Sequence, residues 1–345
     1  MKRREFLIGA ASIAGLATTR TAWTQPARDP AKLARLAIMS LCFQPILRNA
    51  NMENAGTNAA QNLPANQPEL PRTLELMDIG QVFADRWGVH NVEMQHTHFP
   101  STEAAWLRDF KARLAKTKSR VSNINLEFAD MNISQTNPIL RLQAIDLTKR
   151  WIDHAVTLGS PRLMINQGPL TPETKAIAIS ALKAMGDYGQ SKGIKVGTEN
   201  RGSFLPPAGQ ITPALTPSLP GAPPPAGMPP AGVPLGEPAY LLLVDVIKAA
   251  GTHTNCDIGN FADQPLQHAG MRAMFPLTGG NAHVKMNTKR YDLPAAMALA
   301  RELKYTGLFS IEANANLTNS PNSPDMGKDP YENVQKIYDV LIANI

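Results

Sequence analysis

Residues 254–261, TNCDIGNF, decide the fold, because they read as a short buried strand that ends on the carboxylate of Asp257 and then turns. Similar stretches occur at residues 195–200 (KVGTEN), 281–285 (NAHVK) and 309–314 (FSIEAN). Each is a short run with one metal-capable side chain near its C-terminal end. The pattern indicates a series of parallel strands whose polar ends meet on one face.

The spacing of these stretches fits one strand, one loop and one helix per step. From Asp257 to His283 is 26 residues, and from His283 to Glu312 is 29 residues. A repeated unit of this kind predicts a single (β/α)8 barrel over residues 34–345, with its site on the C-terminal face. Glu199 precedes Asp257 by 58 residues, an interval that becomes ordinary once a Pro-rich insertion is removed.

That insertion, residues 205–238, holds 12 of the 29 prolines and follows the fifth predicted strand. Proline at this density excludes regular helix or a central strand. In a barrel the segment emerges on the catalytic face, where a lid or docking arm is one interpretation and a spacer without a role is the other. A polar, Asn-rich segment at 44–67 is expected over the same face.

The remaining elements follow from apolar periodicity and from turn residues. Further strands are expected at 36–43, 89–96, 120–127 and 162–166. Helices are expected at 71–87, 104–117, 138–158, 172–192, 240–250, 269–275, 294–304 and 331–342.

The N-terminus predicts export. Residues 2–7, KRREFL, precede an uncharged stretch at 8–19, a pattern typical of a twin-arginine signal. The stretch is shorter than the roughly 20 residues of a membrane-spanning helix. We therefore expect residues 1–27 to be a signal peptide recognised by the twin-arginine export machinery, and the mature protein to be periplasmic or exported, with no later membrane span.

Composition excludes some classes of function. The net charge of +6 falls to +3 without residues 1–24, which gives little support to nucleic-acid binding. Two cysteines, Cys42 and Cys256, cannot form a disulfide framework and are expected to be buried free thiols.

Three carboxylates and one imidazole at successive strand ends predict a divalent metal site. The set Glu199, Asp257, His283 and Glu312 favours Mn²⁺, Mg²⁺ or Co²⁺, with Zn²⁺ as the alternative. Glu127 ends another strand, and it either lines the site or forms a salt bridge.

This set resembles the metal ligands of the xylose isomerase-like TIM barrels, the sugar phosphate isomerase/epimerase superfamily, and the resemblance covers the chain from about Leu36 onward without the insertion. It implies a metal-dependent isomerase or epimerase that acts on a small carbohydrate through an enediolate. Glu199 and Glu312 would be the acid and base, while Asp257 and His283 would chiefly hold the metal. Export argues for an unphosphorylated sugar or keto-sugar as the substrate.

Five further residues are candidate substrate contacts: Glu93, His96, His98, Asn260 and Lys285. Residues 257–260 resemble the Asp-x-x-His pattern that follows the sixth strand in ketose epimerases, but Asn260 stands at the position of the histidine. An asparagine side chain cannot titrate. Lys285 lies two residues after His283, on the same face, and either stabilises an oxyanion or pairs with a carboxylate. Metal ligation is the alternative for His96 and His98, and Lys289 or Arg290 is a candidate for the family's substrate-contacting arginine.

Other functions fit the same pattern. A lyase or hydrolase acting on 3-keto-glycosides or inosose-like substrates would use the same metal site. A non-enzymatic periplasmic binding protein would keep the barrel without turnover. The sequence does not determine the oligomeric state, and a homo-oligomer is one of the alternatives.

Overall fold

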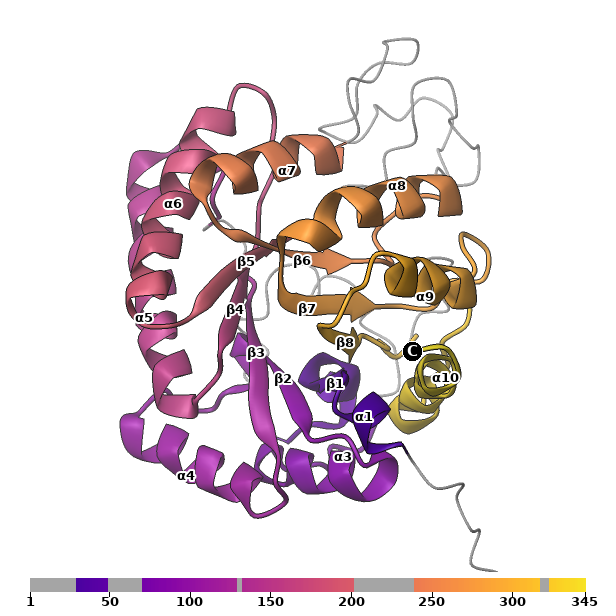
Figure 1. The fold of residues 1–345 in the computed structure, drawn as a ribbon. Coiled ribbons are helices and arrows are strands. Elements are labelled where there is room, and N and C mark those ends of the chain that lie inside the picture. The colour runs from indigo at the N-terminus through magenta and orange to yellow at the C-terminus, as the bar shows by residue number, and fades with distance from the viewer. Residues whose placement is uncertain (1–28, 49–69, 129–131, 202–238, 317–322) are drawn as a thin grey trace, which may run out of the picture.

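Eight parallel strands close into one barrel, which confirms the predicted (β/α)8 fold (Figure 1). Each strand pairs with the next along the chain, and β8 pairs with β1. The computed structural model describes residues 29–48, 70–128, 132–201, 239–316 and 323–345. The predicted signal peptide (1–27), the insertion (205–238) and most of the Asn-rich segment lie outside the described residues.

The strands are short and almost wholly buried, as expected where helices cover the outside of a parallel sheet. They are β1 (Leu36–Met39), β2 (Asn91–Gln95), β3 (Arg120–Leu126), β4 (Arg162–Ile165), β5 (Lys195–Glu199), β6 (His253–Asp257), β7 (Thr278–Val284) and β8 (Leu308–Ile311).

The helices surround the strands (Figure 1). The α-helices are α1 (Pro30–Leu33), α3 (Ile79–Trp87), α4 (Ala104–Ala115), α5 (Pro138–Leu158), α6 (Lys175–Ser191), α7 (Ala239–Ala250), α8 (Gln264–Met274), α9 (Leu293–Glu302) and α10 (Pro330–Asn344). Short 3₁₀ helices are η1 (Ser40–Ile46), η3 (Leu76–Asp78), η4 (His96–His98) and η6 (Phe275–Leu277). Within the described residues, no helix has both the length and the apolar character needed to cross a bilayer.

The first predicted strand was too long. β1 ends at Met39, and the next residues form the 3₁₀ helix η1, which contains Pro45. Cys42 therefore lies beyond the strand, where its thiol donates to Ile311 O (3.3 Å) and accepts from Ala313 N (3.1 Å). Cys42 and Cys256 are both free and buried, as expected.

The interior of the barrel is lined by polar side chains, although such interiors are usually filled by branched apolar residues. The buried inward-facing set is Asn91, Glu93, Asn123, Asn125, Asn255 and Asn281. Arg162 lies toward the N-terminal end, where it donates to Gly279 O (2.8 Å) and Ser122 O (3.2 Å). Buried polar groups are costly unless they are hydrogen-bonded, so this interior calls for an explanation.

Candidate metal centre

Four donor side chains gather at the C-terminal ends of β5 to β8. Glu199 and Asp257 end β5 and β6, His283 is the last but one residue of β7, and Glu312 directly follows β8. These strands are consecutive in the barrel, and Asp257 pairs in register with His283. One ligand atom from each residue lies within 4.8 Å of the others, so the four predicted donors form one group that could hold a metal ion.

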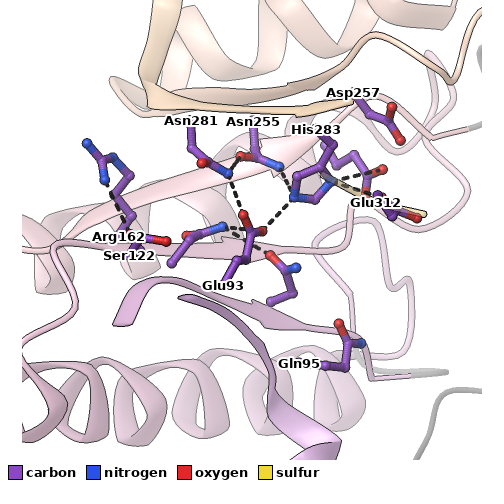
Figure 2. Close-up of polar contacts among 12 residues, drawn as sticks. Glu93, Gln95, Ser122, Arg162, Asn255, Asp257, Asn281, His283 and Glu312 are labelled. Atoms are coloured by element: carbon purple, nitrogen blue, oxygen red, sulfur yellow. Dashed lines mark hydrogen bonds and ion pairs between the residues drawn. The ribbon is translucent and has the colours of Figure 1, made fainter. Parts of the chain in front are cut away.

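The imidazole of His283 lies between the carboxylates of Glu93 and Glu312 (Figure 2). Its Nε2 is 2.6 Å from Glu93 Oε1, on the side of the barrel interior. Its Nδ1 is 3.3 Å from Glu312 Oε2 and 3.8 Å from Glu199 Oε1. That Nδ1 is buried and has no hydrogen-bond partner among the described residues. An orphaned nitrogen between two carboxylates is a suitable metal ligand.

Two cations contact the carboxylates. Lys285 Nζ contacts Asp257 Oδ2 directly and lies 3.1 Å from Glu312 Oε1. Arg201 donates from Nε to Glu199 Oε2 (3.0 Å) and also contacts Glu127. The Glu127 contact agrees with the salt-bridge alternative for that residue.

These contacts set the ionisation of the site. Burial raises the pKa of Glu199, but the charges of Arg201, His283 and Lys285 outweigh burial and hold the pKa well below its usual range. Burial likewise raises the pKa of Glu312, while Lys285 and His283 lower it to a net depression. Asp257 differs, because burial and the two neighbouring glutamates raise its pKa despite Lys285. Glu199 and Glu312 are therefore carboxylates at neutral pH.

His283 responds to the same charges in the opposite direction. Burial lowers its pKa, but Glu93, Glu199 and Glu312 together raise it well above the usual range. A buried imidazole that attracts a proton this strongly lies at a position where positive charge is stabilised. A divalent cation held by the same carboxylates would use that stabilisation.

The balance of charge supports a metal. Five carboxylates with little exposure meet two permanently charged side chains among the described residues. The carboxylates are Glu93, Glu127, Glu199, Asp257 and Glu312, and the cations are Arg201 and Lys285. Even with a proton on both His283 and Asp257, the group keeps a net negative charge that a divalent cation would reduce. Three carboxylates and one imidazole are a donor set that suits Mn²⁺, Mg²⁺ or Co²⁺ and also accepts Zn²⁺.

A cavity of about 410 Å³ opens beside the donor group. Its lining includes Glu312, Asn260 and Lys285, together with Arg290 and Tyr291. Two of the predicted substrate contacts, Asn260 and Lys285, thus border both the cavity and the donor group. Asn260 donates to Glu199 Oε1 (2.8 Å) and accepts from Lys285 Nζ (3.0 Å), so it joins a carboxylate to a cation.

The two histidines of η4, His96 and His98, lie elsewhere. His96 packs edge-on against Phe128, with ring centroids 4.6 Å apart, and its Nδ1 is 3.2 Å from Asn125 O. His98 Nδ1 is 2.9 Å from Ser40 Oγ. Both rings are buried, and neither borders the cavity or belongs to the donor group. Although both residues lie just past the end of β2, they form the 3₁₀ helix η4, and their rings contact Phe128, Asn125 and Ser40 instead of the donor group.

Glu93 also lies away from the position expected for a substrate contact. Alternation along β2 correctly turns its side chain toward the barrel axis, but it is fully buried, is not part of the cavity lining and contacts His283. Burial raises the pKa of Glu93, yet His283 and a hydrogen bond from Asn123 help to bring the pKa to about 2. Glu93 is therefore an ionised carboxylate that contacts His283, a candidate metal ligand, from the barrel interior.

Sequence reasoning missed Arg201, Asn255 and Asn281. Each lies two residues from a predicted ligand, namely Glu199, Asp257 or His283. In a strand this spacing puts side chains on the same face, so Asn255 and Asn281 could have been placed in the interior by alternation. Arg201 lies beyond the end of β5, where alternation no longer applies.

Metal binding should be visible as a gain in stability. Because the ligands lie together only in the folded chain, adding Mn²⁺ to metal-free protein at about 100 times its Kd is expected to stabilise it by about 2.7 kcal/mol. Thermal unfolding with and without Mn²⁺ measures the shift. Asp257→Asn, also unfolded with and without Mn²⁺, should show only a small part of this shift. No shift in the parent protein with Mn²⁺, Mg²⁺, Co²⁺ or Zn²⁺ would contradict a metal centre.

Comparison with known proteins agrees with this architecture. The family described as xylose isomerase-like TIM barrel matches residues 82–209, which confirms the resemblance over that part of the chain. No curated protein matches the sequence. Solved structures share the fold at low identity.

Epimerases are among these structures. D-allulose 3-epimerase from Methylomonas sp. aligns with a TM-score of 0.59 at 13% identity, covering 90% of this chain and 98% of that one. L-ribulose 3-epimerase gives 0.59 at 12% identity, with 90% and 95% covered. 3-Keto-D-glucoside 4-epimerase from E. coli gives 0.53 at 12% identity, with 81% and 95% covered. At such identities the likeness concerns the fold.

Proposed function

We propose that this protein is a metal-dependent isomerase or epimerase of an unphosphorylated sugar or keto-sugar. One observation carries the proposal: Glu199 and Glu312 approach His283 Nδ1 from different strands, to 3.8 Å and 3.3 Å. Two carboxylates that flank one point can serve opposite faces of a small substrate bound between them. Movement of a proton between two faces, or between two carbons, is what epimerisation and isomerisation require.

The protonation states suit this chemistry. Arg201 and Lys285 help to keep Glu199 and Glu312 ionised, so either can accept a proton from the carbon next to a substrate carbonyl. For isomerisation, the glutamate that accepted the proton can return it to the neighbouring carbon of the enediolate. For epimerisation, the second glutamate must first take up a proton from solvent, and it then delivers that proton to the opposite face. Lys285 borders the cavity and can stabilise the oxygen on which negative charge develops.

The metal would be held by Glu199, Asp257, His283 and Glu312. Bound there, it would polarise the substrate carbonyl and its neighbouring hydroxyl and so make the adjacent C–H more acidic. Asp257 is fully buried and is not part of the lining of the cavity beside the donor group, which suits a ligand better than a proton carrier.

The substrate class is inferred from the cavity and from the neighbours. Asn260 offers a neutral amide to a sugar hydroxyl, and Arg290 supplies a positive charge at the cavity wall. The solved neighbours include epimerases of free ketoses and of a 3-keto-glucoside, which supports a keto-sugar. Residues 1–27 support export by the twin-arginine route, and a free sugar is the substrate class that fits a periplasmic protein.

Proton exchange tests the proposal directly. The mature, Mn²⁺-loaded protein is incubated in D₂O with free ketoses, an inosose and 3-keto-glycosides, and the products are followed by NMR. Deuterium at the carbon next to a carbonyl, with an isomeric product, is the expected result. A released aglycone or water would instead identify a lyase that uses the same proton abstraction. No exchange with any substrate despite bound metal would overturn the proposal and favour a binding protein.

A further inference from the structure

Glu93 is a charged side chain buried inside the barrel, away from the cavity. It projects from the middle of β2 and has no exposed surface. Three nitrogens contact it: Asn123 Nδ2 donates to Oε1 (2.9 Å), Asn281 Nδ2 donates to Oε2 (2.9 Å), and His283 Nε2 lies 2.6 Å from Oε1. Figure 2 shows Asn281 and His283 converging on the carboxylate, with His283 between Glu93 and Glu312. A buried carboxylate is kept only where such partners satisfy it.

The arrangement restricts the imidazole. An ionised carboxylate can only accept hydrogen bonds, so the nitrogen that faces Glu93 must carry a hydrogen. The same ring then has its second nitrogen, Nδ1, pointing at Glu199 and Glu312 without a hydrogen-bond partner. A cation held by those two carboxylates would replace a proton on Nδ1 and leave the one on Nε2.

One contact competes with this assignment. Asn255 Nδ2 lies 2.9 Å from His283 Nε2, and an amide donor there would need an Nε2 without hydrogen. That alternative would require Glu93 to carry a proton of its own at the 2.6 Å contact. The charge-assisted bond to a carboxylate is the shorter and the stronger of the two, so it determines the tautomer.

We propose that Glu93 is a positioning residue that holds the proton of His283 on Nε2 and presents Nδ1 to the metal. The Asn123 and Asn281 amides orient Glu93 in turn, and this role explains why the barrel interior carries polar side chains. The inference rests on the metal centre of the proposed function. It adds a residue from β2 to a site whose candidate ligands all come from β5 to β8. An outer carboxylate of this kind contributes to metal affinity by orienting the ligand and raising its basicity.

Metal affinity without substrate is the first test. Kd for Mn²⁺ is measured by calorimetry for the parent protein, Glu93→Gln and the control Gln95→Leu. Glutamine keeps the shape but loses the charge, and the expected loss is about 10- to 100-fold in Kd. Gln95 is also buried on β2, two residues along, and within the described residues its side chain forms no hydrogen bond or ion pair with His283 or another candidate ligand. Its replacement should therefore leave Kd within about threefold of the parent.

The outcomes separate two failures. No Mn²⁺ binding by the parent protein would remove the metal centre, and the proposed function with it. Parent binding with an unchanged Kd in Glu93→Gln would overturn only the role of Glu93. Equal losses in Glu93→Gln and Gln95→Leu would indicate general loosening of β2, and would also overturn it.

A spectroscopic test reads the tautomer of His283 in the parent protein itself. ¹⁵N-histidine-labelled protein loaded with diamagnetic Zn²⁺ gives ring-nitrogen correlations, and His283→Gln assigns the signal of interest among the seven histidines. The expected pattern is a proton on Nε2 in a short hydrogen bond, with Nδ1 unprotonated. A proton on Nδ1 would contradict the proposal. In folded Glu93→Gln the Nε2 proton should shift upfield as the charged acceptor is lost.

Discussion

Replacing Glu312 by glutamine is expected to reduce turnover by about 10²- to 10⁴-fold, the range for loss of a general acid or base. Glutamine preserves the shape and one oxygen for Lys285, which lies 3.1 Å from Glu312 Oε1, but it cannot carry the proton. Some metal should remain bound, because three of the four donors are unchanged. The measurement is the rate of deuterium exchange at saturating substrate, with metal content determined on the same sample.

Glu302→Gln is the matched control for this change. Glu302 lies on α9 and forms an exposed ion pair with Arg272 (2.7 Å), so its loss should leave turnover unaffected. If Glu312→Gln kept the parent rate, the acid/base assignment would fail, and an intact biological role in that variant would favour a binding protein.

Replacing Arg201 by methionine is expected to destabilise the metal-free protein by about 3 kcal/mol, the lower end for breaking a buried ion pair. Arg201 is about one-quarter exposed (26%), but it contacts Glu199, of which only 2% is exposed, and also Glu127. Methionine keeps much of the volume, but it removes the cation that the carboxylates of Glu199 and Glu127 both contact. Urea unfolding in the presence of a chelator measures the loss.

The control is Arg113→Met. Arg113 pairs with Asp78 at 2.6 Å, with both side chains almost half exposed, and such surface pairs contribute about 0–1 kcal/mol. Equal stabilities of the two variants would show that Arg201 is not needed to compensate the buried charge of Glu199. Mn²⁺ should reduce the difference, because it would supply positive charge to the same carboxylate.

The elements that the sequence placed best carry strong local signals at both ends. α5 spans residues 138–158 as predicted, because Asn137 caps its start, Pro138 occupies the first turn and Gly159 ends it with φ 77°. The helix expected from residue 71 starts only at Ile79, after the 3₁₀ turn η3. β1 was overextended, because a short apolar run does not distinguish a strand from the 3₁₀ helix that follows.

The donor group was predictable for a related reason. Each of Glu199, Asp257, His283 and Glu312 lies at or next to the end of its strand, and the ends of neighbouring parallel strands converge. Glu93 illustrates the limit of this reasoning. Alternation tells whether a side chain faces the axis, but not how deep it lies along that axis, so a residue in mid-strand was assigned to the mouth of the barrel.

The hydrogen bond between Glu93 and His283 also bears on how the chain folds. It joins residues 190 positions apart, and β2 and β7 are not neighbours in the sheet. A partly folded chain containing only β5 to β8 would hold all four candidate ligands, but not the carboxylate that orients the imidazole. Because closing such a long loop is slow, full metal affinity should develop only when the first strands join the last. Acquisition of tight metal binding would then report completion of the barrel during folding.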